Sequence, residues 1–132
     1  MSFKQQIIKE RFDILITAEN QTFKAEFELD KSAKVLLGIS ITSNREDLLY
    51  HRGSHRMQLS DKELFPEGFE AKLLMAGLNV APDQRMVTLG ELPTGNATLD
   101  VSYKDTPSSL TTFEPYRVTI YTYSVSSSST NQ

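Results

Sequence analysis

Two histidines are the side chains in this sequence best suited to chemistry. His51 and His55 are the only histidines in the chain. A spacing of four residues would place both imidazoles on one face of a helix, as in a two-histidine metal site. Gly53 lies between them, however, and Arg52 stands where a metalloprotease motif has glutamate. We therefore predict two solvated loop histidines rather than a metal site.

No nucleophile or pair of acids is arranged for hydrolysis. Ser54 precedes His55, but neighbouring residues of a strand point to opposite faces, and no Gly-x-Ser-x-Gly elbow surrounds the serine. Glu26 and Glu28 would share one face of a strand, and paired acids can cleave glycosides. A charged, solvent-facing strand explains these two glutamates more simply. The chain also has no cysteine and no glycine-rich phosphate loop, so we predict no catalytic residue, metal or cofactor.

The most basic segment spans residues 45–56 and contains Arg45, Arg52 and Arg56 with both histidines. Such a segment could contact nucleic acid, an acidic partner or lipid headgroups. Two acidic residues dilute its charge, and the whole chain has a net charge of −3 and a pI of about 5.4. We therefore interpret the segment as surface charge without specific nucleic-acid binding, and we keep the three arginines as candidate interface residues.

Four tyrosines lie in the expected strands of the second half of the chain. Tyr103, Tyr116, Tyr121 and Tyr123 could form a platform for stacking sugars. Such a set is more often divided between the core and a sheet surface. Tyr121 and Tyr123 fall opposite the core-facing positions of their strand, and tyrosine is favoured at protein interfaces. We predict that these two tyrosines meet a neighbouring subunit.

The elements that must position these residues are strands, because apolar and polar residues alternate along most of the chain. In residues 22–30, Phe23 and Phe27 alternate with Lys24 and Glu26, as in a strand with one dry face and one wet face. About eight strands are expected, separated by turn signals at the spacing of a sandwich or barrel. The clearest of them cover residues 11–18, 22–30, 35–42, 55–59, 85–89, 96–103 and 116–123.

Two segments allow more than one interpretation. Residues 64–69, Leu-Phe-Pro-Glu-Gly-Phe, are predicted to form a turn because of Pro66 and Gly68. Residues 70–75 have helical propensity but also alternate, and Gly77 follows too soon for a stable helix. We predict a strand there.

The chain of 132 residues is long enough for one domain with a core of its own. We expect an N-terminal arm at 1–11, a single β-sandwich at 12–123 and a flexible, serine-rich tail at 124–132. No apolar stretch is long enough to cross a bilayer, and the first residues do not form a secretory signal. The absence of cysteine, and so of disulfides, favours a protein that is assembled inside a cell.

The predicted fold class is all-β, an antiparallel β-sandwich without crossover helices. Eight strands in two sheets favour an eight-stranded jelly roll over an immunoglobulin-like sandwich, which would have a characteristic Cys and Trp. The strand pairs 12–18/22–30 and 97–103/116–123, with the joining segments 65–69 and 113–116, resemble single jelly-roll virion proteins of tailless phages, including small vertex (penton) proteins.

This resemblance implies a structural subunit of the virion, assembled in the host cytoplasm, that contacts itself or other capsid proteins through sheet edges, loops and arm. It implies a homo-oligomer and carries over no functional residue. A carbohydrate- or ligand-binding sandwich is the alternative. A cupin-like metalloenzyme is disfavoured, because that site needs several histidines and an acid.

Overall fold

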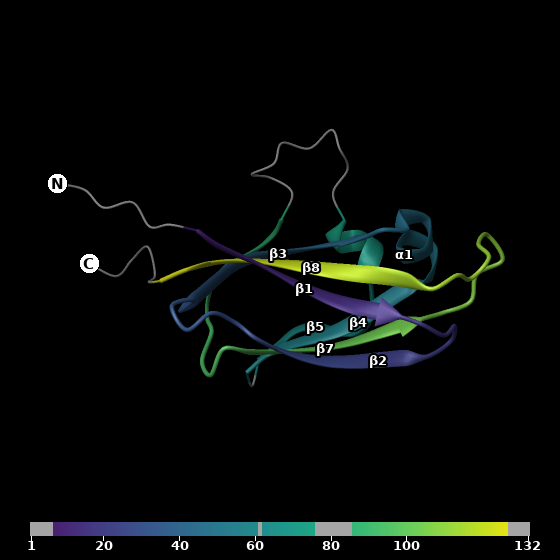
Figure 1. Ribbon diagram of the computed structural model, residues 1–132. Coiled ribbons are helices and arrows are strands. Elements are labelled where there is room, and N and C mark those ends of the chain that lie inside the picture. The colour runs from purple at the N-terminus through teal and green to yellow at the C-terminus, as the bar shows by residue number, and fades with distance from the viewer. Residues whose placement is uncertain (1–6, 61, 76–85, 127–132) are drawn as a thin grey trace.

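Two four-stranded antiparallel sheets pack face to face in the computed structural model, which describes residues 7–60, 62–75 and 86–126 (Figure 1). The first sheet has the order β1 (Ile8–Ile16), β8 (Tyr116–Val125), β3 (Val35–Ser43) and β6 (Val87–Pro93). The second has the order β2 (Thr22–Glu28), β7 (Thr98–Asp105), β4 (Gly53–Leu59) and β5 (Lys62–Glu70). The predicted all-β sandwich is confirmed.

The strand pairs are nested within the chain. The first strand pairs with the eighth, the second with the seventh, the third with the sixth and the fourth with the fifth. Two further ladders, β3 with β8 and β4 with β7, complete the sheets. Every pair is antiparallel, and because the pairs are nested, most contacts join residues that are far apart in sequence.

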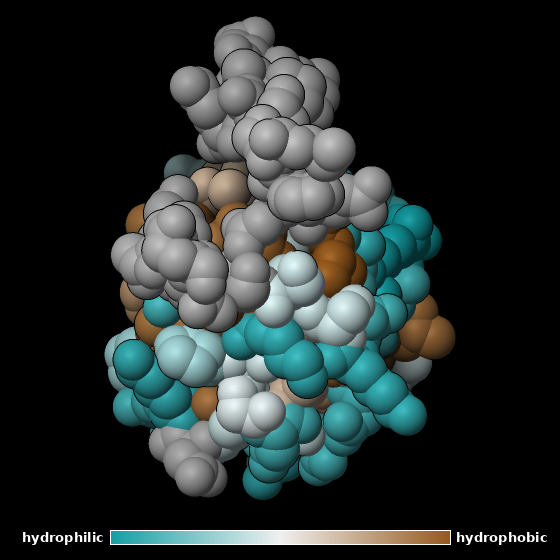
Figure 2. All heavy atoms as spheres, turned by 90° about the vertical axis from the view of Figure 1, so that its left-hand side faces the viewer, coloured by the Kyte–Doolittle hydropathy of each residue, from teal (hydrophilic) through white to brown (hydrophobic). Residues whose placement is uncertain are grey.

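The core lies between the sheets and is built from the inward residues of each alternating strand. In β7 the inward residues Leu99, Val101 and Tyr103 are almost completely buried, as the alternation predicts. A second apolar cluster closes the end of the sandwich where β1 begins and β8 ends. Figure 2 shows this end, and hydrophilic residues cover most of its lower half.

Both predicted boundaries of the sandwich are wrong by a few residues. β1 begins at Ile8 rather than after residue 11, because Ile8 pairs with Ser124 and packs on the second apolar cluster. Ser124 and Val125 belong to β8 and are buried, so the tail does not begin at 124. The rest of the expected arm and tail, 1–6 and 127–132, lies outside the described residues.

One helix was not expected. α1 (Glu46–Arg52) buries Leu48 and Leu49 completely against the core. It has acidic residues in its first turn and basic residues in its last, which suits the helix dipole. Leu48 and Leu49 of the short apolar run at 48–50 therefore lie on the buried face of a two-turn helix, whereas Tyr50 is exposed. No helix in the described ranges has the length and apolar character needed to span a bilayer.

Two other local predictions are wrong. Residues 71–74 form a 3₁₀ helix, η1 (Ala71–Leu74), and not a strand. Ala71 and Leu74, three residues apart, are both buried, which is the period of a 3₁₀ turn. Residues 64–69 lie within β5 rather than in a turn. The strand accommodates Gly68, at φ +85°, through register shifts against β4.

Candidate functional site

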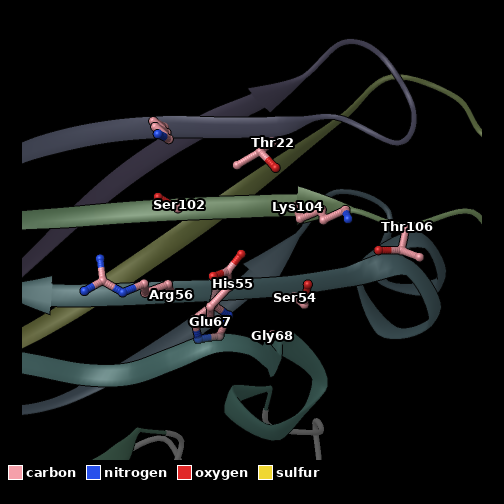
Figure 3. A pocket seen from close by; sticks show the side chains of 10 residues that line it. Thr22, Ser54, His55, Arg56, Glu67, Gly68, Ser102, Lys104 and Thr106 are labelled. Atoms are coloured by element: carbon pink, nitrogen blue, oxygen red, sulfur yellow. The ribbon is translucent and has the colours of Figure 1, made fainter.

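A basin of about 490 Å³ lies on the outer face of the second sheet (Figure 3). Strands β2, β7 and β4 supply its floor, and the irregular part of β5 supplies one side. Its lining includes three cations, Lys24, Arg56 and Lys104, and one carboxylate, Glu67. Four hydroxyl side chains complete the polar lining, namely Thr22, Ser54, Ser102 and Thr106.

Sequence reasoning placed parts of this basin correctly but did not find the basin. Alternation puts Lys24 and Ser102 on the outer faces of their strands, as observed. Whether they are neighbours depends on β2 pairing with β7, and no local pattern reveals that pairing. Arg56 and Ser54 were considered only for other roles.

The two histidines occupy unrelated environments. His51 is exposed on α1 and makes an edge contact with the Tyr50 ring. His55 is 1% exposed on β4 and packs against the rings of Phe65 and Phe69. The prediction of two solvated loop histidines is therefore wrong for His55, and His51 is solvated but lies in a helix rather than a loop. Its inward position in β4 continues the alternation toward Met57, which is the signal that could have placed it.

Neither ring nitrogen of His55 has a hydrogen-bond partner among the described residues. Burial lowers the pKa of this imidazole from 6.5 to about 4, so the side chain is neutral near neutral pH. Ser54, its neighbour, points to the opposite face of β4, into the basin. A serine–histidine catalytic pair is therefore not formed. Within the described ranges, no group of three potential metal ligands is present.

Arg52 is buried and cannot form part of an exposed basic surface, so that prediction is wrong. Its guanidinium donates to both carboxylate oxygens of Asp105, from Nε at 3.0 Å and from Nη2 at 2.9 Å. It also donates to Glu19 and Thr111, both at 3.1 Å, and stacks over the Phe113 ring. The arginine thus joins the end of α1 to the β1–β2 turn and to the loop before β8.

Asp105 is fully buried at the centre of this network. It accepts hydrogen bonds from the Tyr116 hydroxyl at 2.7 Å and from the Asn20 backbone N–H at 3.1 Å. Burial alone would raise the pKa of Asp105, but the hydrogen bonds from Arg52 and Tyr116 outweigh it and hold the pKa below 3.8. Tyr103 extends the chain of hydroxyls, 3.0 Å from the oxygen of Tyr116.

Arg45 and Arg56, the two other arginines of segment 45–56, face solvent at different places on the molecule. Arg45 pairs with Asp47 at 3.0 Å and with Glu114 at 2.7 Å. Arg56 pairs with Glu63 at 2.9 Å beside the basin. The segment 45–56 is therefore not a single basic surface, because its arginines reach three different parts of the molecule.

The four tyrosines do not form one platform. Tyr103 and Tyr116 belong to the core, whereas Tyr121 and Tyr123 are half-buried on the outer face of β8. The Tyr123 hydroxyl lies 3.5 Å from Ser40 Oγ on the neighbouring strand. An interface through Tyr121 and Tyr123 stays a prediction.

Glu26 and Glu28 lie on the exposed face of β2, an edge strand of the second sheet. Glu28 accepts a hydrogen bond from the Thr98 hydroxyl at 3.2 Å, across the ladder with β7. This position agrees with a charged, solvent-facing strand.

Comparisons with protein-family models, with curated proteins and with solved structures found no match for this chain.

Proposed function

We propose that this protein is a non-enzymatic structural subunit of a symmetric assembly, and more specifically a minor capsid or vertex protein of a tailless phage. The nested pairing of its eight strands supports this proposal most. Rolling one long antiparallel hairpin into two sheets produces such pairing. We infer a jelly roll from it, a fold that viral capsid proteins share with lectins. On this proposal, the chain functions in the virion after assembly in the host cytoplasm.

A set of fixed loops at one end of the sandwich suits contacts between subunits. We call this the helix end, defined by the 17–21 connection, α1 and the 106–115 loop, which lie together in Figure 1. Arg52 and Asp105 join all three. Loops that are already ordered lose less conformational entropy when a partner binds, which favours a stable contact.

The helix end also exposes large apolar side chains. Leu110, in the 106–115 loop, is 74% exposed, and Leu15, just before the 17–21 connection, is 66% exposed. Leu15 lines a hollow of about 280 Å³ with Pro115 and Arg117. Exposed apolar groups on ordered elements around a hollow favour a site for another protein surface. The four edge strands, β1, β6, β2 and β5, offer further contact along the sheets.

Size-exclusion chromatography with light scattering tests the proposal. We expect a defined oligomer whose fraction rises with concentration, and we expect Leu15→Asp and Leu110→Asp to shift it toward monomer. Ile7→Asp is the matched control, because Ile7 is also exposed, at 48%, but lies just before β1 at the opposite end of the sandwich. A chain that stays monomeric at millimolar concentration contradicts the proposal.

A ligand-binding β-sandwich is the second candidate, and the basin on the second sheet favours it. Tyr121 and Tyr123 lie on the other sheet, so they cannot contribute to that basin. A glycan array separates the two sites, because loss of binding in Tyr121→Ala or Tyr123→Ala would locate a ligand on the first sheet.

A further inference from the structure

We propose that the basin on the second sheet binds the anionic end of an acidic saccharide, with Lys24, Lys104 and Arg56 holding its carboxylate or sulfate group. This binding activity goes beyond an assembly role and does not depend on it. Figure 3 shows Ser54, Lys104 and Thr106 at one end of the basin, and Ser102 and Arg56 toward the other. The proposal rests on the register of the strands, the unpaired charges and the hydroxyl lining.

Register brings the three cations together. Lys24 on β2 and Arg56 on β4 both lie opposite Ser102 on the intervening β7. Lys104 follows two residues later on β7, so it occupies the diagonal position to both. Diagonal neighbours on one sheet face are about 7–8 Å apart at Cα, within reach of long side chains. The backbone positions of the three cations therefore form a triangle, with Lys24 and Arg56 on either side of Ser102 and Lys104 two residues further along β7.

The positive charge of this triangle is compensated only in part, by Glu63 and by Glu67 of the lining. Lys24 and Lys104 form no ion pair with any residue that the structure describes. Arg56 donates from Nε to Glu63 at 2.9 Å and from Nη2 to Gln58 at 3.0 Å. Three cations on one sheet face repel one another, and a bound anion would relieve that repulsion. A carboxylate or sulfate would accept hydrogen bonds from the same groups.

The hydroxyls of the basin favour a saccharide over other anions. Thr22 on β2 and Ser54 on β4 are the cross-strand partners of Lys104. Ser102 lies in the same way between Lys24 and Arg56. Their hydroxyls form no hydrogen bond within the described chain and are free to bind sugar hydroxyls. Glu67 adds one acceptor. Apart from buried His55, the lining contains no aromatic ring on which a nucleobase could stack.

The surrounding charge limits the length of the anion. On the same face of the sheet, the cross-strand neighbours beyond Lys24, Ser102 and Arg56 include three acidic residues, Glu26, Asp100 and Glu63. These carboxylates would repel a polyanion that extended beyond the basin, such as a nucleic-acid backbone. A volume of about 490 Å³ lies in the range of small-molecule sites. A short saccharide with one acidic group fits both limits.

Titration of the ¹⁵N-labelled protein by NMR tests this assignment. The probes are 3′-sialyllactose, a sulfated chondroitin disaccharide, and lactose as the neutral control. We expect saturable shifts of amides around residues 24, 56, 102 and 104 with an acidic probe, and no saturable shift with lactose. Equal shifts with lactose, or no shift with either acidic probe at tens of millimolar, would overturn the proposal.

Two double variants of equal charge test the residues. Lys24→Ala with Lys104→Ala should weaken binding of the acidic probe by roughly tenfold, the effect of losing two exposed charge contacts. Lys9→Ala with Lys31→Ala removes two exposed lysines outside the basin and should leave affinity within about twofold. Similar losses in both variants would mean nonspecific attraction and refute the site. Tighter binding of an oligothymidylate, sensitive to Lys24 and Lys104, would refute the saccharide assignment.

Discussion

A buried ion pair fixes the loops of the helix end. Arg52 and Asp105 are both nearly inaccessible to water, and each has further hydrogen-bond partners. Such a pair adds little stability over well-packed apolar residues, because removing two charges from water costs about what their attraction returns. Its value here is geometric, since one guanidinium fork determines the positions of three chain segments at once.

Breaking this pair should be costly. Arg52→Ala leaves the Asp105 carboxylate buried without its main partner, and we expect a loss of about 3–5 kcal/mol in the free energy of unfolding. Urea denaturation at pH 7 measures it. Arg45→Ala is the matched control, because the side chain of Arg45 is 37% exposed where it pairs with Asp47 and Glu114, and it should cost about 1 kcal/mol or less. Equal costs for the two variants would contradict a structural role for the buried pair.

His55 should make the fold sensitive to mild acid. Its pKa is about 4 in the folded chain and 6.5 as the ordinary value, so the unfolded chain binds the extra proton between these pH values. Stability should therefore fall as pH drops from 6.5 toward 4, by about 3 kcal/mol in total. Near pH 7 the imidazole is neutral in most molecules of either state, and this destabilisation is absent.

Replacing the imidazole tests this prediction. His55→Leu should reduce the pH dependence of the unfolding free energy between pH 7 and 4.5, a range above the titration of Asp105. Phe69→Leu changes the same cluster but keeps the imidazole, so it should lower stability without removing the pH dependence. If His55→Leu retains the full dependence, another group is responsible for it.

Among the elements, long alternating strands were predictable and short buried helices were not. Residues 98–105 alternate with period two along the whole strand, and residues 116–123 are rich in β-branched and aromatic residues, so both segments clearly favour a strand. α1 and η1 bury only two or three residues each, and so few positions fit a strand, a turn or a helix equally well. Tertiary packing of Leu48, Leu49, Ala71 and Leu74 decides their form.

The site was less predictable than the fold for the same reason. The outward direction of Lys24 and Ser102 follows from local alternation, but their neighbours follow from strand order. Arg56 reaches the same face only because β4 pairs with β7. Arg52 was misjudged because a basic residue near other basic residues resembles solvent-facing charge. Only the distant Asp105 explains its burial.

The junction of α1 and β4 depends on a residue without a side chain. A Cβ built on Gly53 would overlap the Tyr103 hydroxyl and lie 2.8 Å from the Leu49 carbonyl oxygen. The backbone of Gly53 is extended, at φ −89°, so other residues could adopt it. We expect Gly53→Ala to lower stability by about 1–3 kcal/mol through crowding alone.

A double-mutant cycle with Tyr103→Phe identifies the cause. Removing the hydroxyl relieves one of the overlaps, so Gly53→Ala should cost less in the Tyr103→Phe background, measured by thermal or urea unfolding. An identical cost in both backgrounds would exclude the Tyr103 hydroxyl as the source of crowding.

At the scale of the whole molecule, nested pairing places the last two strands, β7 and β8, at the centre of the two sheets. β8 lies between β1 and β3 and therefore forms hydrogen bonds with a neighbouring strand on both sides, although it is the last strand in the sequence. β7 has the same position in the second sheet, between β2 and β4. Neither sheet is complete until the end of the chain has joined segments from its first half.

Native-state hydrogen exchange should reveal this arrangement. Amides of β8 and β7 that bond within the ladders should exchange only through global unfolding, because opening either strand breaks two ladders and exposes the core. Bonded amides of β5 and β6 should exchange through local opening at a free energy lower by roughly 2 kcal/mol or more, since both are edge strands and both have register shifts.

The Arg52→Ala variant separates global from local opening. It should lower the protection of β8 amides by the full loss in global stability, whereas the free energy of local opening at β6 should change less. Protection of β6 equal to that of β8 would contradict this prediction, because it would show that the edge strand opens only together with the rest of the first sheet.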